Sequence, residues 1–102
     1  MLDGGAGIDT VSYSLAAAAV TVSLASSAAQ ATGGSGSDTL VNIENLVGSA
    51  YADRLTGDVL ANRLNGGAGN DTLNGGAGAD ILIGGDGSDI YYVDNVGDSV
   101  VE

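Results

Sequence analysis

A carboxylate recurs every nine residues in the C-terminal half of the chain, each time after a glycine-rich stretch. The clearest units have the sequences GGAGNDTLN, GGAGADILI and GGDGSDIYY, and they cover residues 66–74, 75–83 and 84–92. Each has glycine at its first, second and fourth positions, a large apolar residue at its eighth, and at its sixth Asp71, Asp80 or Asp89. Carboxylate oxygens in a flexible turn, with backbone carbonyls close by, are ligands that suit a hard divalent cation.

Less regular copies of the unit precede and follow this triple. They keep the nine-residue phase at 48–56, 57–65 and 93–101, and two further copies stand apart at 4–12 and 33–41. Their sixth-position residues are Asp53, Asn62, Asp98, Asp9 and Asp38. The segment 42–47 breaks the phase by six residues.

Each unit is predicted to form one tight turn followed by one short strand. Glycine permits the positive φ angles and the close backbone approach of such a turn. The last three residues place one large apolar side chain between two smaller or polar ones, as a strand with a single buried position requires. Two units bring the chain back to the same edge, so a coil takes eighteen residues and its strands stack in parallel about 4.8 Å apart. The expected fold class is therefore all-β, a parallel β-roll or β-solenoid.

The N-terminal part, residues 1–47, is expected to form longer and less regular coils of the same continuous solenoid. Alternation of apolar and small polar residues predicts two half-buried strands, one through Val11, Tyr13 and Leu15 and one through Val20, Val22 and Leu24. Residues 25–32 are predicted to be a loop of small residues. Residues 48–102 are expected to form the regular roll, with a closing segment from residue 93.

Stacking of coils gathers the sixth-position residues into two columns. One column contains Asp53, Asp71 and Asp89, and the other contains Asn62, Asp80 and Asp98. Carboxylates about 5 Å apart repel each other by about 1–3 kcal/mol per pair, and a divalent cation between successive turns reverses the sign of this interaction. An all-oxygen shell of six to eight flexible ligands suits calcium better than magnesium.

At these residues the sequence resembles the RTX (repeats-in-toxin, haemolysin-type) calcium-binding nonapeptide family. The resemblance implies a right-handed β-roll that binds several calcium ions and folds on extracellular calcium after type I secretion. It implies that Asp71, Asp80 and Asp89 bind through their side chains. It also implies backbone carbonyl ligands from Gly66, Ala68, Asn70, Gly75, Ala77, Ala79, Gly84, Asp86 and Ser88. Two departures from the pattern are Asn62 in place of an acid and the missing second and fourth glycines in 48–52.

Two interpretations remain open for the less regular copies. Asp53, Asn62 and Asp98 either bind calcium or cap the backbone of their own turns. Asp9 and Asp38 have the same alternatives, because their stacking partners cannot be placed from the sequence. The side chains of the acids outside the sixth position are expected to be solvated surface charges: Asp3, Asp58, Asp86 and Asp94.

The composition excludes several classes of function. The formal charge is −11, with Arg54 and Arg63 the only basic residues, so the surface repels nucleic acid and anionic membranes. Without Cys, His or Lys the chain has no thiol nucleophile, imidazole base or Schiff-base lysine. No apolar run is long enough for membrane insertion.

We therefore expect no enzyme, but a structural part of a larger secreted bacterial protein that is extracellular or at the cell surface. Its expected partners are calcium and, for the parent protein, the type I secretion machinery. The alternative is a calcium-stabilised module that binds a polysaccharide or a cell surface.

Overall fold

The protein is described by a computed structural model that covers residues 2–25, 30–33, 36–93 and 97–101. Within these residues the chain forms β-strands and turns, and no helix that could cross a membrane. The strands are β1 (Leu2–Asp3), β2 (Thr10–Ser12), β3 (Thr21–Ser23), β4 (Gln30–Gly33), β5 (Gly36–Asp38), β6 (Leu40–Val41), β7 (Asn45–Val47), β8 (Arg54–Thr56), β9 (Arg63–Asn65), β10 (Thr72–Asn74), β11 (Ile81–Ile83), β12 (Ile90–Tyr92) and β13 (Ser99–Val101).

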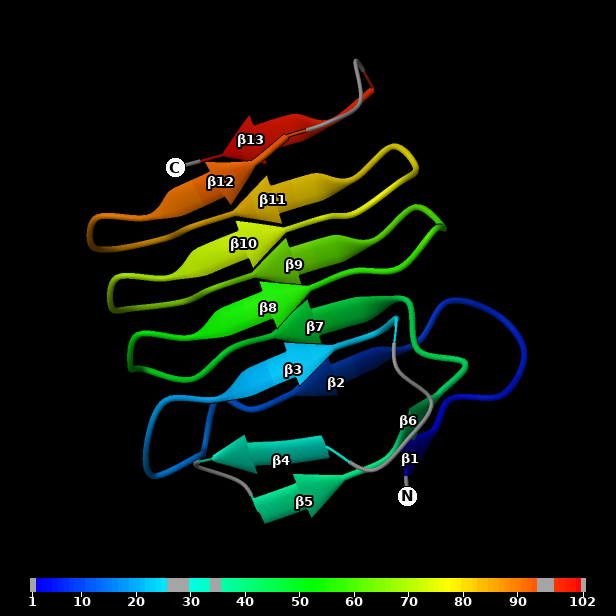
Figure 1. Ribbon diagram of the computed structural model, residues 1–102, viewed down its shortest axis with the longest axis horizontal. Coiled ribbons are helices and arrows are strands. Elements are labelled where there is room, and N and C mark those ends of the chain that lie inside the picture. The colour runs from blue at the N-terminus through cyan, green and yellow to red at the C-terminus, as the bar shows by residue number, and fades with distance from the viewer. Residues whose placement is uncertain (1, 26–29, 34–35, 94–96, 102) are drawn as a thin grey trace.

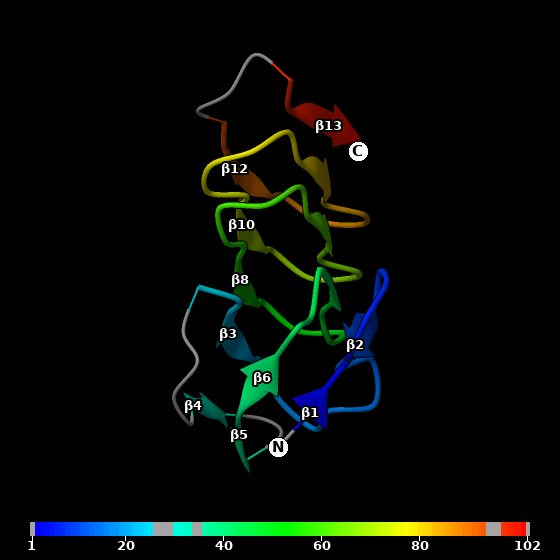
Figure 2. The same cartoon turned by 90° about the vertical axis from the view of Figure 1, so that its right-hand side faces the viewer.

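Two parallel sheets make up the body of the protein. One has the strand order β12-β10-β8-β3 and the other β13-β11-β9-β7-β2, so the chain crosses from one sheet to the other at each turn. Figures 1 and 2 show the two stacks, with β13 at one end of the roll and β1 near the other. The result is a β-solenoid of about 3 turns, which confirms the predicted fold class.

The regular strands coincide with the last three positions of the nonapeptides. Thr72 of β10 pairs with Arg54 of β8 on one side and with Ile90 of β12 on the other, which is the predicted eighteen-residue register. The eighth-position residues point between the sheets, and four of them are 0% exposed: Leu55, Leu64, Leu73 and Leu82. Each such leucine contributes about 1.5–3 kcal/mol by leaving water.

The predicted break in phase at residues 42–47 is wrong in its position. Strand β7 lies in the sheet between β2 and β9, and Asn45 pairs with Arg63 in the regular eighteen-residue register. The unit that ends at Val47 is therefore in phase, with Leu46 fully buried at its eighth position. The irregularity comes earlier, where the chain leaves the two sheets after β3 and returns at β7.

The excursion between β3 and β7 differs from the expected loop and isolated repeat. Strand β4 begins at Gln30, inside the predicted loop 25–32, and it pairs with β5 in an antiparallel ladder. The Gln30 side chain holds this strand to the end of β3, because it accepts a hydrogen bond from Ser23 N (2.8 Å) and donates one to Ser23 O (2.7 Å). The copy at 33–41 is thus divided between β5 and β6, and β6 pairs in parallel with β1.

Both strands predicted around β2 and β3 are longer in the prediction than in the structure. Val20 and Val22 are buried as expected, but β2 ends at Ser12. The chain turns after Tyr13, where Ala16 N donates to Tyr13 O (2.9 Å). This turn keeps Tyr13 in the core and leaves Leu15 98% exposed, so the predicted burial of Leu15 is wrong.

Candidate metal centre

The sixth-position side chains connect successive coils of the roll through hydrogen bonds. In one column Asp53 N donates to Asp71 Oδ1 (2.8 Å) and Asp71 N donates to Asp89 Oδ1 (2.9 Å). In the other column Asn62 N donates to Asp80 Oδ1 and Asp80 N donates to Asp98 Oδ1, both at 2.8 Å. The structure therefore brings together both sets of residues that the stacking argument placed in columns.

The central carboxylates of the columns are buried. Asp71 is 1% exposed and Asp80 is 0% exposed, at the same depth as the leucines between the sheets. The pKa of Asp71 is raised from 3.8 to about 7, chiefly by desolvation and in part by the charges of Asp53 and Asp89, against the hydrogen bond from Asp53 N, which lowers it. Ionisation of the buried carboxylate in this column at neutral pH is therefore unfavourable.

One oxygen of Asp71 has no hydrogen-bond donor. Its Oδ2, like that of Asp89, is buried without a hydrogen-bonding partner among the described residues. A Cβ atom built on Gly66 would overlap Asp71 Oδ2, and one built on Gly84 would overlap Asp89 Oδ2. The first glycine of each unit thus gives the carboxylate room to lie under its own turn. A buried carboxylate oxygen without a donor is unfavourable, and a cation in the turn would satisfy it.

Glycines at the second and fourth positions shape the turn backbone. Gly67 and Gly69 have φ angles of 81° and 93°, and Gly76 and Gly78 repeat them at 75° and 88°. Successive turns are in backbone contact, since a Cβ on Gly69 would lie 2.7 Å from the carbonyl oxygen of Tyr51. Backbone carbonyl oxygens, among them those of Tyr51, Gly67 and Gly69, therefore lie close to the next turn of their column.

Side chains alone do not make a metal centre here. Within the described residues, no three acidic, imidazole or thiol side chains converge on one point. A cation at Asp71 must therefore take most of its ligands from backbone carbonyls, which favours calcium with its large and flexible oxygen shell.

The model of the RTX calcium-binding nonapeptide repeat (4 copies) matches residues 60–91 of the chain. This part of the chain is therefore similar to an RTX repeat array. The match contains the sixth-position residues Asn62, Asp71, Asp80 and Asp89. A search of curated proteins found no match. The match to RTX repeats supports a structural calcium-binding module in this part of the chain.

Glu44 extends one of the two columns beyond the matched segment, and the sequence reasoning missed it. Asp9 N donates to Glu44 Oε2 (2.9 Å), and Asn62 Nδ2 donates to Glu44 O (2.8 Å), so Glu44 lies between these two residues in the column. Asp9, whose stacking partner could not be placed, is thereby assigned to this column. The signal was present, since Glu44 lies nine residues before Asp53, but its turn lacks the glycines that mark the other units.

A second missed feature is the polar residue that precedes a glycine-rich turn. Gly67 N donates to Asn65 Oδ1 (3.1 Å) and Gly76 N donates to Asn74 Oδ1 (3.0 Å). These asparagines occupy the ninth position of the preceding unit. They hold the second amide of these two turns toward the preceding strand and away from the carboxylate.

In two of the less regular copies the sixth-position side chain caps the backbone of its own turn. Ser49 N donates to Asp53 Oδ2 (2.6 Å), and Asp58 N donates to Asn62 Oδ1 (2.8 Å). Asp38 lies outside both columns and accepts a hydrogen bond from the Tyr13 hydroxyl (3.1 Å). Burial, and then the charge of Asp38, raise the pKa of Tyr13 above its usual value. Of the acids predicted to be solvated, Asp94 lies outside the described residues.

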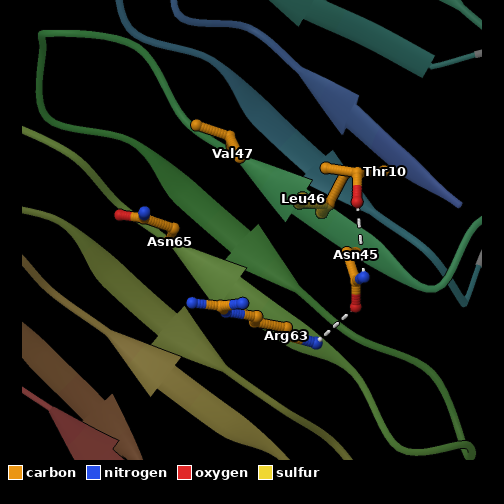
Figure 3. A pocket seen from close by; sticks show the side chains of 6 residues that line it. All are labelled: Thr10, Asn45, Leu46, Val47, Arg63 and Asn65. Carbon is orange, nitrogen blue, oxygen red and sulfur yellow. Dashed lines mark hydrogen bonds between the residues drawn. The ribbon is translucent and has the colours of Figure 1, made fainter.

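A shallow depression of about 270 Å³ lies on the outer face of the sheet formed by β2, β7 and β9. Figure 3 shows its lining: Thr10, Asn45, Leu46, Val47, Arg63 and Asn65. Asn45 Nδ2 donates to Thr10 Oγ1 (3.3 Å), and Arg63 N donates to Asn45 Oδ1 (3.0 Å). Hydroxyl, amide and guanidinium groups thus form a polar strip away from the turns. Arg54 lies on β8 in the opposite sheet.

Proposed function

We propose that this chain is a calcium-driven folding module within a larger secreted bacterial protein. The observation that carries the proposal is the Oδ2 atom of Asp71, a buried carboxylate oxygen without a hydrogen-bond donor under a glycine-rich turn. Asp71, Asp80 and Asp89 would hold calcium through their side chains. Carbonyl ligands would come from the turns at 66–70, 75–79 and 84–88. Bound calcium supplies the positive charge that the buried columns lack.

Calcium binding contributes directly to folding in this proposal. A ligand that binds only the folded state stabilises it by RT ln(1 + [L]/Kd), and the turns that would bind exist only in the roll. We expect dissociation constants of about 10⁻⁴–10⁻³ M, the range of extracellular calcium modules. Because each coil contacts only its neighbours, formation of one coil favours the next and binding is cooperative.

Export in the unfolded state is consistent with folding that depends on calcium. At low cytosolic calcium the charge of −11 and the 18 glycines oppose folding. The parent protein would leave the cell unfolded through type I secretion machinery, and the module would order where extracellular calcium reaches the columns. The proposed location is therefore extracellular or at the cell surface.

Circular dichroism during calcium addition to chelated protein tests the proposal. We expect β-structure to appear cooperatively, and Asp71→Ala and Asp80→Ala each to lower the number of bound ions measured by calorimetry. Complete β-structure in excess chelator would show that the turns serve packing alone.

A second candidate function is binding of a polysaccharide or cell surface by the folded roll. The polar strip of Figure 3 supports it, because Thr10, Asn45, Arg63 and Asn65 present hydroxyl, amide and guanidinium groups on one flat face. In saturating calcium, neutral and uronate-containing oligosaccharides would be titrated and followed by NMR. Arg63→Gln should weaken binding, whereas Arg54→Gln on the opposite sheet should leave it unchanged. Equal effects of the two substitutions, or no binding, would exclude this face.

A further inference from the structure

We propose that calcium occupancy of the roll is discontinuous: the turns 48–53 and 57–62 are closed by their own hydrogen bonds and exclude calcium. These turns lie between the glycine-rich turns at 66–71, 75–80 and 84–89 and the isolated glycine-rich turn at 4–9. The inference rests on the proposed calcium function and assigns which of its turns bind. The residues at the second and fourth positions decide the assignment.

Turn 48–53 satisfies both oxygens of its carboxylate. Asp53 Oδ2 accepts Ser49 N (2.6 Å), and Asp53 Oδ1 accepts both Ser49 Oγ (2.6 Å) and Val20 N (2.9 Å). Asp53 is 3% exposed, so these donors replace water for a buried charge. A calcium ion would have to displace hydrogen bonds at both oxygens.

In turn 57–62 the sixth-position side chain is also hydrogen-bonded, although it is an uncharged amide. Asn62 Oδ1 accepts Asp58 N (2.8 Å), and Asn62 Nδ2 donates to Glu44 O (2.8 Å). Asn62 is 3% exposed, and both its amide oxygen and its amide nitrogen take part in a hydrogen bond. The carboxylate of Asp58 lies at the turn as well, but its Oδ1 accepts Leu60 N (2.8 Å). This turn therefore presents no unsatisfied oxygen from its sixth-position side chain.

The direction of one amide distinguishes the closed turns from the glycine-rich ones. Ser49 N and Asp58 N point at the sixth-position side chain, whereas Gly67 N donates to Asn65 Oδ1 on the preceding strand (3.1 Å). Gly67 has a φ of 81°, and among the described residues the only non-glycine with positive φ is Asn42. A side chain at the second position thus disfavours the conformation that turns the amide away. As a consequence Asp71 keeps an oxygen without a donor, and Asp53 does not.

Glycine substitution in a closed turn tests the inference as a gain of binding. The double variant Ser49→Gly/Tyr51→Gly gives turn 48–53 the glycine pattern while Asp53 is retained. Bound calcium would be counted by equilibrium dialysis, with folding in saturating calcium checked by circular dichroism. We expect one more calcium ion per chain than in the wild-type protein. Ala50→Gly, at an exposed position of the same turn, is the matched control and should leave the number unchanged.

The second closed turn supplies an independent test if the first variant does not fold. Asn62→Asp alone should add no ion, because Asp58 N still donates to residue 62. Asn62→Asp with Asp58→Gly and Leu60→Gly should add one. The inference is overturned if the folded glycine variants bind the wild-type number of ions, or if Asn62→Asp alone adds an ion. A wild-type chain that binds no calcium would instead refute the proposed function.

Discussion

Asp71→Asn should change stability in opposite directions with and without calcium. The substitution removes a negative charge from the centre of one column and keeps the shape of the side chain. Asn62 shows that the roll accommodates an amide at the sixth position, where Nδ2 donates to a carbonyl oxygen of the preceding coil, that of Glu44 (2.8 Å). We expect the new side chain at position 71 to keep accepting the hydrogen bond from the Asp53 amide through its Oδ1.

The magnitude without calcium follows from the pKa of Asp71, which desolvation raises from 3.8 to about 7. Such a shift corresponds to at most about 4 kcal/mol of destabilisation of the charged form. The effective dielectric constant of a protein is about 20 even at buried sites, which reduces this penalty to roughly 1–2 kcal/mol. Because the folded-state pKa lies above the unfolded-state value, the penalty is present at pH 8, and the variant should be more stable than the wild type in chelator.

In calcium we expect the opposite difference in stability, with the variant less stable than the wild type. At about 100 mM calcium, a site with a dissociation constant of 10⁻⁴–10⁻³ M stabilises the fold by about 2.7–4.1 kcal/mol. This exceeds the gain of roughly 1–2 kcal/mol, and the variant should lose at least one site. Urea denaturation in calcium should therefore show the variant to be the less stable protein. In chelator, folding driven by trimethylamine N-oxide should need less osmolyte for the variant than for the wild type. A variant that is less stable in both conditions would refute the reasoning.

Three further predictions concern proton binding, the turns and the core. In chelator the wild-type protein should need less osmolyte to fold at pH 5 than at pH 8. The reason is that between pH 3.8 and about 7 the folded state holds a proton on Asp71 that the unfolded state has lost. The same osmolyte concentration for half-maximal folding at both pH values would count against a buried charge at Asp71. Gly75→Ala should raise the calcium concentration needed for half-maximal folding at least about twofold, since its Cβ would overlap Asp80 Oδ2. Such overlap costs about 1–3 kcal/mol, which is shared among the several ions that bind cooperatively. Ala77→Gly, in the exposed part of the same turn, serves as its control, and equal midpoints would contradict the role of the first glycine. Leu64→Ala should lower the free energy of unfolding in calcium by about 2–5 kcal/mol. Val59→Ala, at a position 76% exposed, should change it by less than about 0.5 kcal/mol. Similar losses of stability in the two variants would argue against a core built on the eighth-position residues.

The period of the sequence was sufficient to predict the regular part of the roll. A nine-residue unit with one apolar position permits one strand per unit and one buried side chain per strand, and Leu55, Leu64, Leu73 and Leu82 are where this argument puts them. The same stacking brings Asp71 and Asp89 into one column, as their hydrogen bond shows.

The rest could not be predicted because it depends on contacts between non-repeating segments. Glu44 occupies a column position, but no glycine marks its turn, and only its contact with Asp9 reveals it. Strand β4 is held by the Gln30 side chain, a tertiary contact without a sequence signal. Leu15 continued an alternating pattern, but the turn after Tyr13 exposed it. Whether Asp53 caps its turn depends on the Ser49 amide, which the spacing of residues does not determine.

The central claim, that cations in the turn columns order this roll, is tested most directly by adding calcium to the chelated wild-type protein and following far-UV circular dichroism and calorimetry together. The account predicts a cooperative gain of β-structure that coincides with the binding of several calcium ions. β-structure that is already complete in excess chelator, or calcium binding without a gain of structure, would contradict it.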